Sequence, residues 1–341
     1  MKVWEIGEQK SVSSLRLVER PDPKPGPGQA VVAMKAASLN RRDVNVMSGG
    51  YGGAKPATRI PLSDGAGDVI AVGEGVTSVK VGDRVTATHF TPWNDGAFDP
   101  AFFASDLGIT IDGWLTERAL VPANCLVPIP TELTYADAAA LPVAAVTAWS
   151  VIEGLGNIKS GDTVLTLGTG GVSSFALQIA KMNGARAAIT SSSDAKLARC
   201  KELGADILVN YKTRPDWDKA VREQNGGRGV DIVVETGGFA TLGQSLAACA
   251  PNARVGMIGA LGGRPEQSPA MFPLVGQNIT LKGITSGPRR MFLDLFKALV
   301  ATRTKPIIDK TFAFADAPKA YQHMVDSEFL GKIIVSTERA A

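Results

Sequence analysis

The stretch Gly161–Lys181 reads GDTVLTLGTGGVSSFALQIAK, and it decides the fold. A short apolar run, Thr163–Leu167, meets the turn Gly168-Thr-Gly170-Gly171, and apolar residues then recur at helical spacing from Val172 onward. Glycine lets the chain turn sharply after a strand and approach a pyrophosphate closely, and the N-terminus of the following helix attracts phosphate. The order of strand, glycine turn and helix therefore predicts a dinucleotide-binding unit.

The turn departs from the complete pattern G-x-G-x-x-G at one position. Gly168 and Gly170 match its first two glycines, whereas Ser173 stands at the third. Serine is small enough for close packing between helix and strand, so we expect the departure to be mild. Glycine-rich turns are common, so the turn needs support from its context.

That context is an alternation of short apolar runs with helical segments. Beyond Thr163–Leu167, the expected strands are Arg186–Thr190, Ile207–Asn210, Val230–Glu235, Arg254–Gly259 and Ile279–Ile284. Helices are expected between them, for example at Asp194–Leu203 and Thr241–Cys249. Such alternation predicts a doubly wound α/β fold, in which a six-stranded parallel sheet is covered on both faces and ligands bind at the carboxyl ends of the strands.

The chain before this region has a different pattern, in which glycine and proline separate short alternating runs. The expected strands are Ala30–Ala36, Asp68–Val72, Arg84–Thr88 and Leu115–Val121, which indicate a β-rich, barrel-like domain. We expect residues 123–285 to form the dinucleotide-binding domain. Residues 1–122 and 286–341 are expected to form the other domain, because the strand-like run Lys332–Ser336 can return to it.

Composition narrows the class of protein. The chain has 341 residues, 45% of them hydrophobic and 20% charged, which suits two globular domains. A net charge of +3 and the absence of a basic cluster argue against nucleic-acid binding. No apolar run approaches the roughly 18 residues of a membrane span, and no signal peptide is visible. Three widely spaced cysteines (Cys125, Cys200 and Cys249) are expected to be buried free thiols. We therefore expect a cytoplasmic protein with a small-molecule substrate.

Further motifs occur in a characteristic order along the chain. They are SLNRRD at Ser38–Asp43, PLSDGAGDV at Pro61–Val69, VKVGDRV at Val79–Val85, KELGAD at Lys201–Asp206 and FLGKI at Phe329–Ile333. With the glycine turn, they resemble the medium-chain dehydrogenase/reductase superfamily, and within it the zinc-independent, quinone-oxidoreductase-like branch. The resemblance implies a Rossmann sheet, a GroES-like barrel domain and a homodimer that pairs the nucleotide-binding domains edge to edge.

The resemblance also bears on metal binding. It places Asn40, Ser63 and Val143 at the positions of the catalytic zinc ligands in zinc-dependent members. Catalytic zinc needs three nitrogen, sulfur or carboxylate ligands, which these residues do not supply. His89 and His323 lie far apart in sequence and are expected at the surface or in loops. The sequence therefore predicts no zinc.

The residues after the second and third expected strands favour NADPH over NADH. Ser191 and Ser192 can bond a 2′-phosphate, and Lys196 can neutralise it. By resemblance, Tyr211 touches the same phosphate. An acidic residue there would favour NAD, but we expect Asp194 to cap the following helix. Lys196 remains ambiguous, because a nearby lysine can also bind the adenine ribose in NAD enzymes.

Other residues are expected to line the cofactor site. By resemblance, Thr147 touches the nicotinamide carboxamide, although it could simply pack at the start of a helix. Lys332 contacts the cofactor or is a surface lysine. The remaining expected cofactor-binding residues are Gly168, Gly170, Gly171, Val172, Thr236, Gly259, Ala260 and Leu261.

Without zinc, an activated acceptor such as a quinone or an α,β-unsaturated carbonyl is the easier substrate, because hydrogen bonds can stabilise its developing oxyanion. By resemblance, Asn40, Asp43 and Tyr51 line the catalytic pocket, and Tyr51 could donate a proton. Alternatively, Asn40 bonds only loop backbone and Tyr51 is a loop aromatic. Arg41 and Arg42 are expected in solvent.

Two further points stay open. The aromatic stretch 88–113 forms either a loop that packs its own rings or a wall of the substrate pocket. For function, the first hypothesis is an NADPH-dependent quinone or enone reductase. The second is a metal-free NAD(P)-dependent alcohol dehydrogenase or ketone reductase, and the third is an NADPH-binding protein with residual activity.

Overall fold

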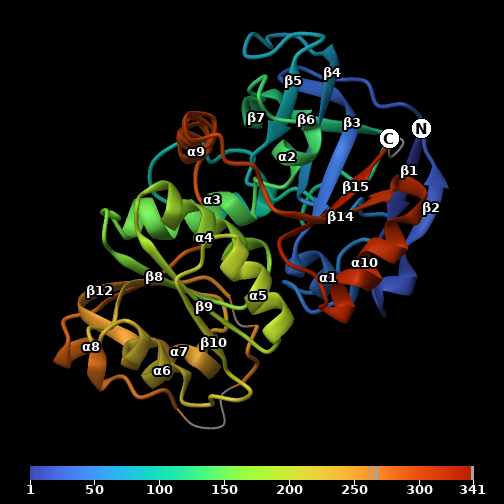
Figure 1. Ribbon diagram of the computed structural model, residues 1–341. Coiled ribbons are helices and arrows are strands. Elements are labelled where there is room, and N and C mark those ends of the chain that lie inside the picture. Colours follow the sequence, from blue (N-terminus) through green and yellow to red (C-terminus); the bar gives the residue numbers. More distant parts are fainter. Residues whose placement is uncertain (260, 265–267, 339–341) are drawn as a thin grey trace. The chain divides into compact units, whose positions relative to one another are not determined.

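The computed structural model describes residues 1–259, 261–264 and 268–338, which form two compact units (Figure 1). Unit 1 comprises Met1–Ala144 and the chain from Gly287 onward, and unit 2 comprises Ala145–Ser286. The first boundary lies later than the predicted 122/123. The reason is that β7 (Leu126–Pro128) pairs with β5 (Arg84–Ala87), which keeps this segment in unit 1.

Unit 2 is built on a six-stranded parallel sheet in the order β10-β9-β8-β11-β12-β13. Its strands are β8 (Thr163–Leu167), β9 (Arg186–Ser191), β10 (Ile207–Asn210), β11 (Val230–Glu235), β12 (Cys249–Met257) and β13 (Thr280–Gly283). The chain starts in the middle at β8, runs outward to β10, and returns to β11 on the other side of β8. This is the predicted doubly wound order, and it puts the carboxyl ends of β8 and β11 side by side.

Helices cover both faces of this sheet. They are α4 (Gly171–Met182), α5 (Asp194–Glu202), α6 (Trp217–Gln224), α7 (Phe239–Ala248) and α8 (Phe272–Gly276). In Figure 1, α4 and α5 lie on the face opposite α6 and α7. The central strands β8 and β11 are fully buried because both faces of the sheet are covered, and in β11 this includes Asp231 and Glu235.

Unit 1 contains a mostly antiparallel sheet in the order β14-β15-β3-β4-β5-β7. Its other strands are β3 (Gln29–Leu39), β4 (Asp64–Val72), β14 (Ile308–Ala313) and β15 (Lys332–Ser336), and β6 (Arg118–Pro122) also pairs with β3. The first half of β3 pairs with β6 and its second half with β15, so the sheet branches there. The predicted return of Lys332–Ser336 to the first domain is confirmed.

The remaining elements complete unit 1 and the segment around residue 145. They are β1 (Lys2–Glu5), β2 (Arg16–Glu19), α1 (Arg41–Met47), α2 (Tyr135–Ala139), α3 (Ala144–Trp149), α9 (Arg289–Thr302) and α10 (Ala317–Asp326). Short 3-10 turns occur at Val12–Ser14, Pro100–Ser105, Ala123–Cys125 and Phe314–Asp316, and α3 continues as a π-helix over Ser150–Leu155.

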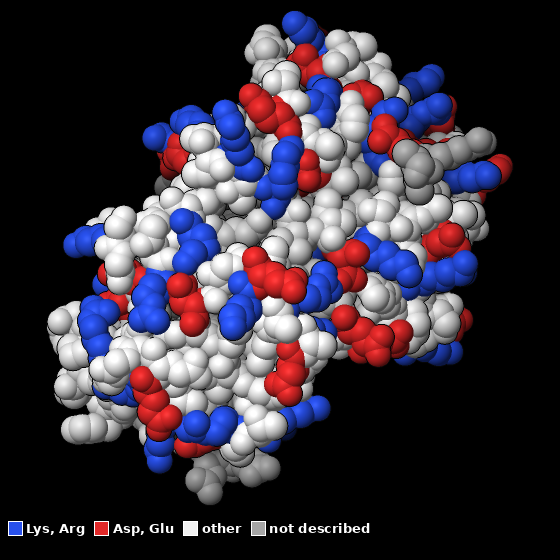
Figure 2. Space-filling view, viewed as in Figure 1, with Lys and Arg blue, Asp and Glu red and all other residues white. Residues whose placement is uncertain are grey.

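Several expectations about residue classes can be compared with the structure. The three cysteines are buried and free, as predicted. Within the described ranges, no helix is long and apolar enough to cross a membrane. On the face shown in Figure 2, basic and acidic side chains are interspersed rather than gathered by sign.

Candidate functional site

The glycine turn of unit 2 has the backbone that a pyrophosphate requires. Gly168 adopts φ +77°, in the left-handed region that favours glycine, and Gly170 is the N-cap of α4 in an extended conformation. A Cβ added at either position would meet no atom within 4 Å, so the space beside the turn is open. No side chain caps α4 at this end, which leaves its first N–H groups for a ligand. These residues fit a dinucleotide.

Two side-chain hydroxyls bond the backbone of Leu167, the last residue of β8. Ser173 donates to the carbonyl of Leu167 at 2.7 Å, and Thr236 donates to the same oxygen at 3.0 Å. Ser173 is buried, so the serine at the third position of the pattern does serve the packing expected of glycine. Thr236, predicted as a cofactor residue, lies beside the turn at the end of β11, with its hydroxyl committed to the backbone.

The residues predicted to bind a 2′-phosphate follow β9 and β10. Ser191 is buried, Ser192 and Lys196 are half-buried, and Tyr211 is exposed. The expected capping by Asp194 is wrong: Ser193 caps α5 by accepting from the Lys196 N–H at 3.4 Å, because it stands one residue before the helix starts. Asp194 instead accepts from the Asn210 amide at 2.8 Å.

The predicted nicotinamide border follows β12. Gly259 lies two residues beyond the end of β12, and Leu261 is 60% exposed with its N–H bonded to the Thr236 carbonyl at 3.2 Å. Ala260, also predicted there, falls outside the described residues. Thr147 is buried within α3. None of these placements tests a contact with a nicotinamide, so the predicted contacts stay predictions.

A second group of functional candidates lies in unit 1, where β3, β4 and β15 run side by side. Asn40 follows β3 and starts α1, Asp64 begins β4, and Lys332 begins β15. Asp43, in the first turn of α1, accepts from the Asn40 backbone N–H at 2.7 Å. The strand register therefore brings together residues that are almost 300 positions apart in the sequence.

The ammonium of Lys332 lies at the centre of this group. It donates to the Leu39 carbonyl at 2.8 Å and to Asn40 Oδ1 at 2.6 Å, and it lies 3.3 Å from Asp64 Oδ2. Lys332 is 1% exposed, so the surface-lysine alternative is wrong. A cofactor contact by Lys332 would have to use other atoms, because each ammonium proton already has an acceptor.

The two ends of the Asn40 carboxamide face opposite charges. Its Oδ1 accepts from Lys332, and its Nδ2 donates to Asp64 Oδ2 at 2.9 Å. The alternative that Asn40 bonds only loop backbone is therefore wrong. The other carboxylate oxygen of Asp64 accepts from the Val143 N–H at 3.1 Å.

A buried ion pair lies beside this group. Arg42 binds Asp106 through two nitrogens, at 2.8 and 3.0 Å, and it also contacts Ser63 and His89. Burial disfavours ionised Asp106, but Arg42 and His89 outweigh burial and lower its pKa. Burial and the Arg42 charge lower the pKa of His89, which keeps it neutral.

One expectation is overturned here, because Arg42 is not solvated and its side chain is only 10% exposed. His89 lies in a loop, which is one of the two expected places, but it is buried there and lies 2.9 Å from Asp106. His323 lies in α10 rather than a loop, half-buried, with its Nε2 2.9 Å from Asp309. Arg41 is half-buried and bonds Ser327 at 2.8 Å.

Asp43 and Tyr51 complete the predicted catalytic set. Asp43 is 1% exposed, and burial raises its pKa to about 7 although Arg42 opposes the shift. Among the described residues, its Oδ1 has no hydrogen-bond partner. Tyr51 is half-buried against the unit 1 core and close enough to Arg42 to contribute to the raised pKa of that guanidinium.

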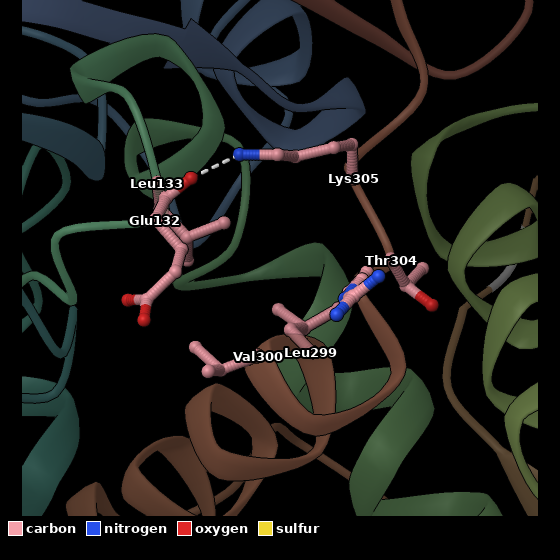
Figure 3. Close-up of a pocket in the computed structure, with 7 residues that line it drawn as sticks. Glu132, Leu133, Leu299, Val300, Thr304 and Lys305 are labelled. Carbon is pink, nitrogen blue, oxygen red and sulfur yellow. Dashed lines mark hydrogen bonds between the residues drawn. The ribbon is translucent and has the colours of Figure 1, made fainter.

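The aromatic stretch packs on itself. The rings of Phe90, Trp93, Phe98 and Phe103 contact one another at centroid distances of 5.2–6.3 Å. This favours the first alternative, a loop that packs its own aromatics. A separate hollow of about 230 Å³ in unit 1 shares no residue with the polar group. Figure 3 shows its lining residues, which include Leu133, Leu299 and Val300 together with polar and charged side chains, and the Lys305 ammonium is bonded to the Glu132 carbonyl.

The donor set in unit 1 does not fit a catalytic zinc ion. Asn40, Ser63 and Val143 stand at the positions that the family resemblance assigns to zinc ligands, and Val143 offers only its backbone. Throughout the described chain, no three His, Cys, Asp or Glu side chains are grouped to hold a metal. The carboxylate of Asp64 is already paired with an ammonium.

The sequence did not reveal the pairings Lys332–Asp64 and Arg42–Asp106. One signal was available: Lys332 heads a run, Lys332–Val335, that is otherwise apolar and strand-like. A lysine in a fully covered strand needs a buried acceptor, and the carboxylates near the ends of other strands are the candidates.

Two protein families and several known proteins match this chain. Residues 26–131 match the alcohol dehydrogenase GroES-like domain, and residues 171–301 match the zinc-binding dehydrogenase family. A zinc-type alcohol dehydrogenase-like protein of Schizosaccharomyces pombe is 39% identical over 92% of both chains. An acryloyl-coenzyme A reductase of Metallosphaera sedula is 29% identical over 99% of this chain and all of the relative.

Solved structures show the same architecture over nearly the whole chain. One from Sinorhizobium meliloti is 38% identical, with a TM-score of 0.90 over 98% of both chains. An NAD-dependent alcohol dehydrogenase is 30% identical, with a TM-score of 0.88 over 99% of this chain and 100% of the other. A mycobacterial protein complexed with NADPH is 26% identical, with a TM-score of 0.82 over 98% and 99%. The chain is an NAD(P)-dependent oxidoreductase and belongs to the medium-chain dehydrogenase/reductase superfamily.

Proposed function

We propose that this chain reduces a quinone or an α,β-unsaturated carbonyl with NADPH, without a catalytic zinc ion. One observation carries the proposal: the Lys332 ammonium lies among Leu39 O, Asn40 Oδ1 and Asp64 Oδ2. These are the oxygen atoms that a cation would use at this place. A divalent ion beside the ammonium would be repelled by it and would lack three suitable ligands.

The residues of unit 1 suit an acceptor that needs no Lewis acid. When bound, NADPH supplies a hydride, and the protein supplies position and electrostatics. A conjugated carbonyl takes up the hydride at its β-carbon, and negative charge develops on its oxygen. Asn40 can stabilise that oxygen with an amide N–H, and Tyr51 is the candidate to deliver the proton that completes the reduction.

The relatives support this class of acceptor and also suggest a second candidate. Acryloyl-coenzyme A reductases of Metallosphaera sedula and Sulfurisphaera tokodaii are 29% and 26% identical, and acryloyl thioesters are α,β-unsaturated carbonyl compounds. Other relatives are named alcohol dehydrogenases, which favours ketone reduction as the second candidate.

The acceptor is tested on purified protein. Bound metal is measured first, and NADPH oxidation is then followed at 340 nm with a quinone, an enone and a simple ketone. We expect turnover on the quinone or enone with less than stoichiometric zinc, and no loss after dialysis against a chelator. Turnover on the ketone alone would replace our proposal with the second candidate. Tight NADPH binding without turnover would leave only a binding role.

The preference for NADPH is tested at Lys196. We expect Lys196→Ala to weaken NADPH binding about tenfold and NADH binding much less, because a lost charge-assisted contact to a 2′-phosphate affects only NADPH. Fluorescence titration with both cofactors measures this. Lys201→Ala, an exposed lysine of the same helix α5, is the matched control. Equal weakening of the two cofactors would refute the assignment.

A further inference from the structure

The carboxamide of Asn40 is clamped between a cation and an anion. Its Oδ1 accepts from the Lys332 ammonium at 2.6 Å, and its Nδ2 donates to Asp64 Oδ2 at 2.9 Å. Lys332 and Asp64 also approach each other to 3.3 Å, so the three side chains form a closed triangle. The backbone N–H of Asn40 is held separately, by Asp43.

This clamp determines which way the carboxamide points. An ammonium can only donate hydrogen bonds, and a carboxylate can only accept them. A carboxamide turned by 180° would place its NH₂ against Lys332 and its oxygen against Asp64, which would replace two favourable contacts by two repulsive ones. Neutral neighbours would not distinguish the two orientations so strongly. The charge pair therefore fixes one orientation of Asn40.

Of the three residues, Asn40 is the least buried. Asn40 is 9% exposed, whereas Lys332 and Asp64 are 1% and 0% exposed. Lys332 cannot reach a substrate itself, because its three protons are directed to Leu39, Asn40 and Asp64. The NH₂ of Asn40 has two protons, and Asp64 accepts only one of them at Oδ2. A charged donor at Oδ1 also polarises the amide and strengthens its N–H groups as donors.

We propose that Lys332 is a positioning residue for the reduction: it orients and polarises the Asn40 carboxamide so that the second N–H of Nδ2 binds the carbonyl oxygen of the acceptor. This inference rests on the proposed function. Hydride from NADPH forms the new C–H bond at the β-carbon, and the electrons of the C=C bond shift to the oxygen that Asn40 stabilises. A proton from Tyr51 or solvent then yields the saturated carbonyl, and NADP⁺ is the oxidised product.

A double-mutant cycle tests whether Lys332 acts through Asn40. Steady-state kcat and KM are measured with NADPH and an enone for Asn40→Ala, Lys332→Met and the combined variant. Loss of the donor in Asn40→Ala should lower kcat about 100-fold. Lys332→Met should lower kcat by at least about tenfold, and the combined variant should be no slower than Asn40→Ala alone. If the loss of kcat in the combined variant equals the product of the two single losses, the residues act independently and the proposal is overturned.

Lys332→Met leaves the carboxylate of Asp64 buried without its cation, so this variant could lose activity because it fails to fold. A second variant separates the two effects. The paired change Lys332→Gln with Asp64→Asn removes both charges and keeps groups of similar size, so the fold should persist by circular dichroism. We expect its kcat to fall about tenfold with KM for NADPH unchanged, because the carboxamide is no longer locked. A folded paired variant with wild-type kcat would refute the role of the charges.

Two comparisons make the outcomes distinguishable. Lys310→Met removes an exposed lysine from β14, the strand next to β15, and should leave kcat unchanged. If the wild type reduces only ketones, the proposed acceptor is wrong, and the same cycle run with a ketone still decides the role of Lys332. If the wild type reduces no acceptor, both proposals fail.

Discussion

Asp43 combines full burial with a shifted pKa, and this has a consequence for stability. Burial raises the pKa of Asp43 from 3.8 to about 7, with Asp64 adding to the rise and Arg42 and Lys332 opposing it. The folded protein therefore holds this proton where the unfolded chain has released it. Between about pH 4 and pH 7 the free energy of unfolding should fall as pH rises.

We expect Asp43→Asn to stabilise the protein at pH 8 by at most about 4 kcal/mol, because a neutral side chain avoids burying a charge. The gain should vanish near pH 4, where Asp43 is protonated in both states. Urea denaturation of both proteins from pH 4 to pH 8 measures the difference. Asp99→Asn, at an exposed cap, is the control and should show no such trend. A constant difference at all pH values would contradict the expectation.

Single residues also mark the limit of what the sequence could predict. The family resemblance identified Asn40 and Asp43 as pocket residues, and both lie in the buried polar group. Arg42, His89 and Lys332 were expected in solvent, at the surface or against the cofactor, because charged residues are seldom fully buried unless they are paired. Their partners Asp106 and Asp64 lie 64, 17 and 268 positions away, and only the tertiary fold brings them together.

At the scale of elements, the turn between β8 and α4 allows cofactor binding to be tested separately from stability. Gly170 has an extended backbone, and an added Cβ would meet no atom of the protein within 4 Å. Gly170→Ala should therefore leave the melting temperature within about 2 °C of wild type. Its methyl group would occupy space that the pyrophosphate needs, so NADPH binding should weaken at least about tenfold.

Calorimetry and a fluorescence titration on the same sample measure both quantities for Gly170→Ala. A fall in melting temperature with unchanged affinity would show that this glycine serves folding rather than the cofactor. Gly168→Ala provides the contrast. Its φ of +77° strains any other residue, so that variant should lose about 1 kcal/mol of stability as well as affinity.

The sequence predicted the elements of unit 2 well, and local periodicity explains why. All six strands were expected close to their observed positions, because each is a short apolar run between glycines or helices. The hairpin of β1 and β2, the strand β14 and the helix α10 were not expected. Three of four residues in β2 are exposed, and β14 has no buried residue, so neither carries a clear apolar pattern.

At the scale of the whole molecule, two features of unit 2 bear on the predicted homodimer. β13 is the last strand of the unit 2 sheet, so one of its edges has no partner in the described chain. On α8, Phe272 and Val275 are 81% and 84% exposed. An unpaired edge strand and exposed apolar side chains are features that association with a second copy would cover.

We expect sedimentation of the wild type as a dimer, and of Phe272→Glu with Val275→Glu as a monomer that remains folded. The two carboxylates would have to be desolvated in the predicted interface, and the free-energy cost of burying these charges exceeds the stabilisation that the contact provides. Leu203→Glu, an exposed apolar residue after α5, is the control and should stay dimeric. A monomeric wild type at micromolar concentration would contradict the predicted assembly.

The place of Lys332 in the chain has a consequence for biosynthesis. Asn40 and Asp64 leave the ribosome early, whereas the lysine that holds them follows Asp64 by 268 residues. At about 5–20 residues per second, some 13 to 54 seconds of translation separate the carboxylate from its cation. During that interval Asp64, the first residue of β4, lacks the cation that β15 later supplies. Ribosome-bound chains stopped before residue 332 should therefore be markedly more sensitive to protease in this domain than chains extended beyond it.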